Sequence, residues 1–162
     1  MGSLVTATDL TVVVSESVDL NGVNRNSKHV STISSIGEVF NRIMSVPTTG
    51  IDLSQFASAE GAGTFSTGDS GAGTVEYMRF TNLDDTNFVT ITCSDDISAG
   101  SSGHLFCIKL AAGKSFILGS VAFNADDDGD ADNALDASDT IANIRAVANT
   151  ASVDMEIYIA SQ

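Results

Sequence analysis

Alternation of apolar and polar residues constrains the fold of this chain more than any other feature. Near the start, Leu10, Val12 and Val14 fall on alternate positions, and the same spacing resumes at Val18 and Leu20. A period of two puts successive side chains on opposite faces of a β-strand, whereas a helix needs a period near 3.6. The pattern ends at Asn21-Gly22, a dipeptide that favours the tight turn of a β-hairpin. The N-terminal region is therefore predicted to be β-structure.

Similar short segments follow along the whole chain, separated by Gly- or Asn-rich connections. Such a succession without crossover helices is typical of stacked antiparallel sheets. We predict an all-β fold, an antiparallel β-sandwich or jelly roll of about ten short strands, forming one domain over residues 1–162. The segments 104–110 and 115–123 are expected to pair with each other across Ala111-Ala112-Gly113-Lys114. The expected strands are 10–20, 27–33, 35–46, 51–56, 75–81, 88–94, 104–110, 115–123, 140–147 and 153–160.

The segment 35–46 has two interpretations. Its apolar residues fit helical spacing, yet Phe40, Met44 and Val46 also fit one face of a strand. A strand is the prediction, because the neighbouring segments are β and Pro47 would end it. A short helix is the alternative.

Two long loops are expected between the strands, at 57–73 and 124–136. The first is rich in Gly, Ser and Ala and offers little to bury, which is typical of a mobile surface loop. It lacks the Lys and the following helix of a phosphate-binding loop. The second loop alternates oxygen-bearing side chains around Gly129, a pattern that suits Ca²⁺. Its candidate metal ligands are Asn124, Asp126, Asp128, Asp130 and Asp132.

That acidic loop departs from an EF-hand at an important point. Leu135 stands where the bidentate Glu would be, and no flanking helices are evident. A looser calcium loop is one hypothesis, and a solvated acidic loop without metal is the other. No cofactor is required by any other feature.

The charge balance narrows the classes of partner. Seven Lys and Arg face 21 Asp and Glu, which gives a formal net charge of −14. Nucleic acid and anionic membrane surfaces are disfavoured, because both are recognised through clusters of basic residues. No apolar stretch approaches the length of a membrane helix, and residues 1–14 show no secretory signal, so synthesis in a cytoplasm is expected.

The inventory of catalytic groups is poor, and we predict that the chain is not an enzyme. His29 and His104 lie far apart without metal-ligand companions, and no G-x-S-x-G motif occurs. Glu76 with Asp84 or Asp85 would offer a glycosidase pair, but a chain without Trp lacks aromatic platforms for sugars.

Three further residues carry structural predictions. Cys93 and Cys107 lie in neighbouring predicted strands and are expected to be small buried apolar residues, with a disulfide as the alternative. Arg79 is one of few cations in an acidic chain. It is expected to pair with a carboxylate within the subunit, or alternatively across a subunit contact.

Three stretches carry a resemblance to a known group of proteins: EYMRFTNLDDTNFVTI, IKLAAGKSFIL and IANIRAVANTASVDMEIYIAS. The chain resembles small β-sandwich virion proteins of tailed bacteriophages, particularly those from marine and cyanobacterial hosts. TDLTVVVSESVDLNG and RIMSVPTTG are similar in style. The likeness leaves out the Gly-rich and Asp-rich loops, and it implies no catalytic residues.

The resemblance implies a virion structural protein, most directly a capsid decoration or cement subunit. A tail- or fibre-associated subunit or host-surface adhesin is the first alternative, and a glycan-binding jelly-roll module is the second. The expected partners are the major capsid protein or other virion proteins, with trimers or dimers of the chain itself. The expected location is the virion, assembled in the host cytoplasm.

Overall fold

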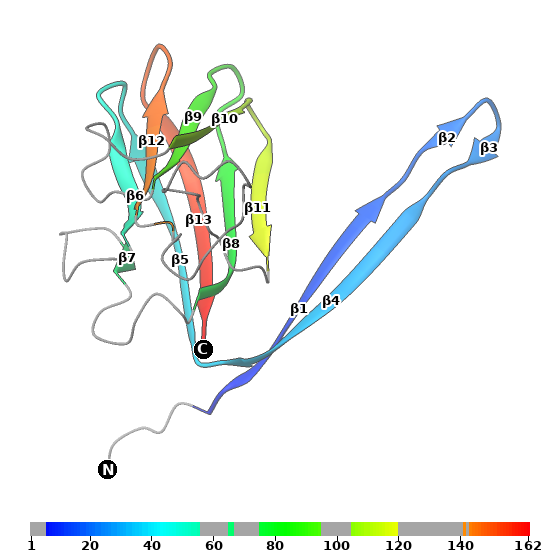
Figure 1. Cartoon of the computed structure of the whole chain (residues 1–162). Helices are drawn as coiled ribbons and strands as arrows, with labels where there is room; N and C mark the ends of the chain where they lie inside the picture. Colours follow the sequence, from blue (N-terminus) through cyan, green and yellow to red (C-terminus); the bar gives the residue numbers. More distant parts are fainter. Residues whose placement is uncertain (1–5, 56–64, 67–74, 95–104, 120–140, 142) are drawn as a thin grey trace, which may run out of the picture.

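The computed structural model describes residues 6–55, 65–66, 75–94, 105–119, 141 and 143–162. These residues form two facing β-sheets and a long β-hairpin that projects away from them (Figure 1). No helix occurs in this described part of the chain. The prediction of an all-β fold with a β-sandwich is confirmed.

The sandwich consists of a four-stranded and a five-stranded sheet. The four-stranded sheet has the order β11-β8-β13-β5 and is antiparallel throughout. The five-stranded sheet has the order β10-β9-β12-β6-β7, in which only the short β7 runs parallel to its neighbour. The strands are β5 (Glu38–Val46), β6 (Ile51–Gln55), β7 (Phe65–Ser66), β8 (Val75–Asn82), β9 (Val89–Ser94), β10 (Leu105–Leu110), β11 (Ser115–Gly119), β12 (Asn143–Ala148) and β13 (Val153–Ser161).

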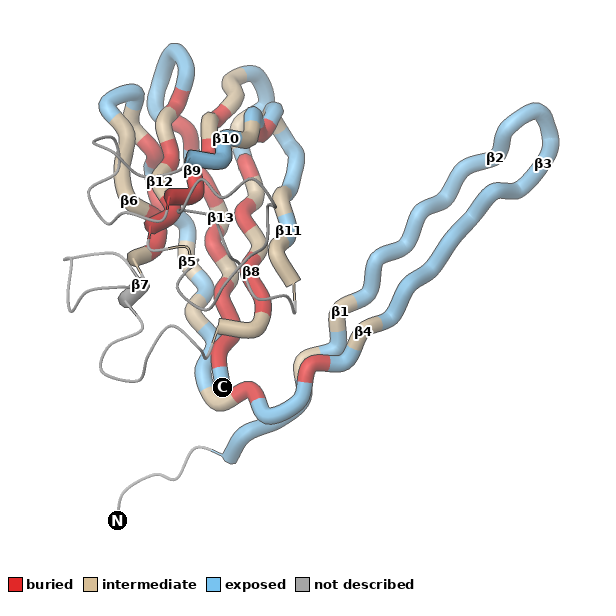
Figure 2. The backbone as a smooth tube through the Cα atoms, in the orientation of Figure 1, coloured by how far each residue is buried: buried red, intermediate tan, exposed pale blue. Residues whose placement is uncertain are grey.

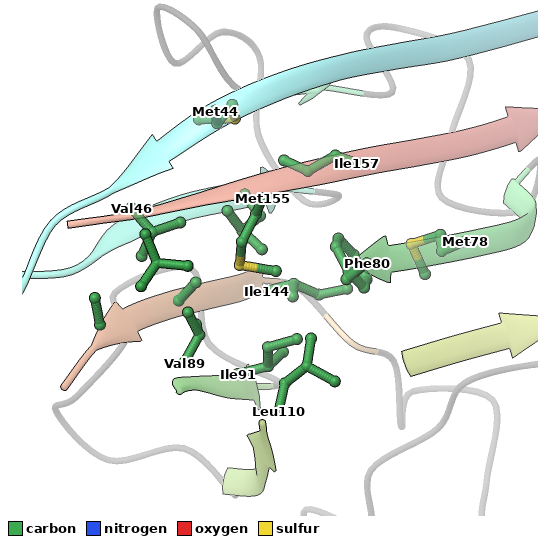
Figure 3. Packing of buried hydrophobic residues seen from close by; sticks show 14 of the residues in the cluster. Met44, Val46, Met78, Phe80, Val89, Ile91, Leu110, Ile144, Met155 and Ile157 are labelled. Atoms are coloured by element: carbon green, nitrogen blue, oxygen red, sulfur yellow. The ribbon is translucent and has the colours of Figure 1, made fainter. Parts of the chain in front are cut away.

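The core lies between the two sheets and follows from the period-two pattern. On β13, Val153, Met155, Ile157 and Ile159 all point inward and are fully buried, while the residues between them face outward. Phe80 of β8 is likewise fully buried. Figure 3 shows Phe80 and Met155 beside Ile144 of the opposite sheet, and Val89 and Ile91 of that sheet belong to the same cluster. Burial of this apolar surface supplies the main stabilisation of the sandwich.

Within the segment 35–46, residues 38–46 form a strand as predicted, whereas Ser35 and Ile36 end the preceding strand. β5 runs from Glu38 to Val46 and ends at Pro47. Ser35 has a φ of 65°, a left-handed conformation that L-residues other than Asn and Asp adopt rarely. Ser35 and Ile36 are the last residues of β4 (Ser27–Ile36), and Gly37 separates this strand from β5. The helical alternative is wrong.

The predicted hairpin between 104–110 and 115–123 is wrong. β10 pairs with β9, whereas β11 pairs with β8 in the other sheet. The link 111–114 therefore crosses from one sheet to the other, with Lys114 N donating to Ala111 O at 3.2 Å. Two strands with alternating apolar and polar residues, joined by a short turn that contains Gly, can form a hairpin within one sheet or a link between two sheets. The sequence pattern alone does not distinguish these two connections.

A buried amide stabilises this crossing. Asn82 is fully buried, and its Nδ2 donates to the carbonyl oxygens of Leu110 at 3.2 Å and Asn87 at 2.9 Å. Its backbone N donates to Lys114 O at 2.9 Å. One side chain thus satisfies carbonyl groups that the change of sheet would leave without partners.

The projecting hairpin, which we call the arm, comprises residues 8–36. β1 (Thr8–Glu16) pairs with β4 (Ser27–Ile36), and β2 (Asp19–Leu20) pairs with β3 (Val23–Asn24) at the tip. Asn21 and Gly22 have φ values of 54° and 76°, as a tight two-residue turn requires, so the predicted turn is confirmed. The arm belongs to neither sandwich sheet, a division that the expectation of one sandwich over residues 1–162 did not contain.

The two predicted long loops fall mostly outside the described residues. In the segment 57–73, the described residues are Phe65 and Ser66, which form β7 rather than part of a loop. The segment 124–136 lies wholly outside the described residues.

Candidate protein-interaction surface

The most exposed apolar side chains of the described structure include several on the arm. Val13 and Val30 are directly opposite each other across the β1–β4 pair and are 52% and 50% exposed. Near the tip, Val18, Leu20 and Val23 are also about half exposed or more. Figure 2 shows that the arm is exposed along nearly its whole length. Exposed apolar side chains on a projecting element make the arm a candidate site of protein contact.

The base of the arm is anchored on the sandwich. Ile33 and Ile36 are buried in a small cluster with Tyr77 and Ala160, which lie on the outer face of the four-stranded sheet. Leu10, Val12 and Tyr158 are partly buried around it. The arm is therefore attached by apolar contacts at its base, and these contacts stop before its middle.

Polar contacts continue along the same outer face. Arg79 Nη2 donates to Glu156 Oε2 at 2.8 Å, which confirms the predicted ion pair within the subunit. The Arg79 guanidinium also lies 5.9 Å from the ring centre of Tyr158, and the Tyr158 ring meets Tyr77 edge-on at 5.9 Å. Burial raises the pKa of Tyr77 above its usual range, although the charge of Arg79 opposes this shift. These contacts fix the platform on which the arm rests.

A second ion pair ties the five-stranded sheet to its loop. Arg145 Nη1 contacts Asp52 Oδ1 at 3.3 Å, and its Nη2 donates to Thr49 O at 3.1 Å. A Cβ on Gly50, which has a φ of 82°, would lie 2.9 Å from Arg145 Nη2. The close approach and the positive φ both require glycine at this turn.

Of the carboxylates considered as a glycosidase pair, Asp84 and Asp85 lie in the turn after β8, and Glu76 lies on β8 itself. Asp84 Oδ1 accepts hydrogen bonds from the backbone N of Asn87 at 2.6 Å and of Thr86 at 2.7 Å. These hydrogen bonds lower the pKa of Asp84 below its usual value, and the bond from Asn87 has the largest effect. Asp85 accepts from the Thr86 hydroxyl in the same turn, while Glu76 lies half-buried on β8. Asp84 and Asp85 thus serve the turn after β8.

The remaining candidate residues are spread out. His29 is exposed on β4, and His104 lies outside the described residues. The same holds for Asn124, Asp126, Asp128, Asp130 and Asp132, so the calcium loop stays a prediction. Among the residues that the structure describes, no group of three His, Cys, Asp or Glu side chains could hold a metal ion.

The two cysteines lie on opposite faces of the five-stranded sheet. Cys93 is opposite Phe106 and is buried in the core, whereas Cys107 is opposite Thr92 and exposed. Both thiols are free. The prediction of a buried apolar residue is therefore confirmed for Cys93 and wrong for Cys107, and the disulfide alternative is wrong. Burial, with a smaller contribution from Cys107, raises the pKa of Cys93 to about 11.

The sequence did contain a signal for the arm. Val12, Val13 and Val14 are consecutive, which breaks the alternation and puts valine on both faces of β1. A strand with one face on a core would carry polar side chains on the other face. Val13 and Val14 are instead both exposed, on the part of the hairpin beyond its anchored base.

No helix in the described part of the chain is long and apolar enough to span a membrane. Comparison with models of protein families, with curated proteins and with solved structures found no match to this chain.

Proposed function

We propose that this chain is a structural subunit of a bacteriophage virion, most directly a capsid decoration or cement protein. The observation that carries the proposal is the arm, whose apolar residues beyond the anchored base are exposed although they belong to an ordered hairpin. The resemblance of three sequence stretches to phage virion proteins supports the same assignment.

The proposed mechanism is adhesive. The sandwich has a buried core, and the whole arm from Thr8 to Leu20 is about 40 Å long by the rise of a β-strand. An element of this length can reach across a seam between two capsid subunits. Repetition of a modest contact over a symmetric shell then makes the total attachment strong.

Charge is consistent with a position on the outside of a shell. The net charge of −14 opposes close contact with packaged DNA and limits aggregation of free subunits. The partners would be the major capsid protein or other virion proteins, and assembly would take place in the host cytoplasm. A catalytic role is not part of the proposal.

The test is the position of the chain in virions made from the genome that encodes it. Cryo-electron microscopy is expected to show one sandwich at each equivalent site on the capsid surface, with the arm over a neighbouring subunit. Density only at the tail or fibres would replace the decoration role with the tail-associated alternative. Absence of the chain from purified particles by mass spectrometry would refute both assignments.

A further inference from the structure

The arm joins the sandwich through one short stretch of chain. Within the described residues, the only passage of the chain between them is at Gly37, which follows β4 and precedes β5. Gly37 N donates to Ser161 O at 2.9 Å, so the hydrogen bonds of the four-stranded sheet begin there. Ile36, the residue before it, pairs with Thr8 within the arm. The direction of the arm therefore depends on the backbone dihedrals of Ile36 and Gly37.

The apolar contacts that hold the arm form a cluster of their own. Ile33 and Ile36 of the arm are buried against Tyr77 and Ala160, which with the partly buried Tyr158 form what we call the seat. None of these residues belongs to the core cluster between the two sheets. Opening of the seat would therefore expose a small set of side chains and leave the core of the sandwich closed.

The base of the arm is also bent. The pairing of β1 with β4 shifts in register where Ser34 and Ser35 form a β-bulge. Ser35 has a φ of 65°, and a residue other than glycine stays in this conformation only where its surroundings hold it. The buried side chains of Ile33 and Ile36 flank the bulge on both sides. Docking of these two side chains thus holds the bend, and the backbone strain at Ser35 favours release.

We infer that the arm is a hinged unit, which leaves the seat and turns about Ile36 and Gly37 while both sandwich sheets stay paired. Docked and released arms are then two states of the same chain. Release does not require the hairpin to unfold, although a released hairpin is marginally stable alone and exchanges its amides faster. The released arm reaches partners at more than one angle.

The inference goes beyond the proposed function, because it concerns a motion of the free chain. It can be tested with purified protein and without a capsid. In a virion, the hinge would let the arm follow a seam whose angle differs from that of the docked arm. A failure of the hinge would leave the position of the chain in the particle open to its own test.

The experiment measures the rate at which tetranitromethane nitrates Tyr77 in the full chain, with the site assigned by mass spectrometry. Tyr77 is 7% exposed in the docked state, so its modification reports release. Ile36→Ala removes a contact with the seat and should raise the rate about thirtyfold. Gly37→Ala narrows the conformations of the released hinge and should lower the rate about threefold. The added Cβ fits the docked state, since it would lie 3.6 Å from Gln162 C.

Two controls separate release from other changes. Ile43→Ala, at an exposed position of β5, should leave the nitration rate within about twofold of wild type. Val13 and Val30 are directly opposite each other, so Val13→Cys with Val30→Cys allows a disulfide that closes the hairpin. In a Cys107→Ser chain, this disulfide should leave the rate within about twofold of that of Cys107→Ser alone, because release is a motion of the whole hairpin.

Three results would overturn the inference. One is a nitration rate that falls about tenfold or more when the hairpin carries the disulfide, because release would then require unfolding of the arm. Another is Gly37→Ala protein that is nitrated as fast as wild type or faster. The third is amide hydrogen exchange in β13 that increases together with Tyr77 nitration in Ile36→Ala protein, which would show that the sandwich opens as well.

Discussion

The arm and the sandwich are both antiparallel β-structure, yet they differ in what holds them. The sandwich buries Phe80, Ile144, Ile157 and their neighbours between two sheets. The arm buries Ile33 and Ile36 at its base and exposes Val13 and Val30 farther out. An isolated two-stranded hairpin is marginally stable in water. Local strand preference and a good turn therefore shape the arm, whereas a buried core stabilises the sandwich.

The largest change in the free energy of unfolding is expected from a substitution in the core of the sandwich. Phe80→Ala removes a fully buried ring and should lower the free energy of unfolding by about 3–5 kcal/mol. Val13→Ala, on the arm, should change it by less than about 0.5 kcal/mol in dilute solution, because Val13 lacks a core around it. Chemical denaturation of both variants measures the difference. Equal losses would contradict the distinction between the two regions.

A smaller effect should loosen the arm without unfolding the sandwich. Ile33→Ala removes a buried side chain from the anchoring cluster and should cost about 2 kcal/mol in the local stability of the arm base. The rate of amide hydrogen exchange should then increase in β1 and β4 and stay unchanged in β13. Val30→Ala on the same strand is the control and should leave the base intact. Faster exchange in β13 would show that the two regions unfold together.

Loss of the buried Asn82 side chain, which lies where the chain crosses between the sheets, should destabilise the sandwich and leave the arm unchanged. Asn82→Ala leaves the carbonyl groups of Leu110 and Asn87 without their donor and should lower the free energy of unfolding by about 1–3 kcal/mol. Asn41→Ala, at an exposed position of β5, is the control and should change it by less than about 0.5 kcal/mol. A loss no greater than that of Asn41→Ala would remove the proposed role of Asn82.

The smallest effect concerns acid sensitivity of the turn after β8. The pKa of Asp84 is lowered in the folded state, so its contribution to stability is present above the unfolded value of 3.8 and is lost as the pH falls through the lower folded value. Asp84→Asn should remove that part of the acid dependence and leave the arm unaffected. Denaturation midpoints measured from neutral pH to below 3.8 test this. An unchanged pH profile in the variant would contradict the assignment.

The sandwich was largely predictable from the sequence, because burial between two sheets imposes the period of two that β13 displays from Val153 to Ile159. The ion pair of Arg79 was predictable from the scarcity of cations. The crossing at 111–114 was not, since a turn that stays in one sheet and a turn that changes sheets need similar residues. Cys107 was missed because the pattern does not say which face of an edge strand is covered.

The candidate interaction surface was harder to predict than the fold. The turn at Asn21-Gly22 indicated a hairpin, but not that the hairpin leaves the sandwich. That outcome depends on the bend at Ser35 and on the packing of the arm base against Tyr77 and Ala160. This packing joins parts of the chain that are distant in sequence. The three consecutive valines at 12–14 were the local clue, since they supply apolar side chains to both faces.

The central claim is that the arm makes the contacts of this chain with its partners in a virion. Its most direct test compares hydrogen exchange of the full chain between the free protein and the protein assembled in the virion. Partner contacts on the arm should slow exchange of the β1 and β4 amides on assembly and leave those of β9, β12 and β13 unchanged. An arm that exchanges at the same rate in both states, with new protection confined to the sandwich, would contradict the account.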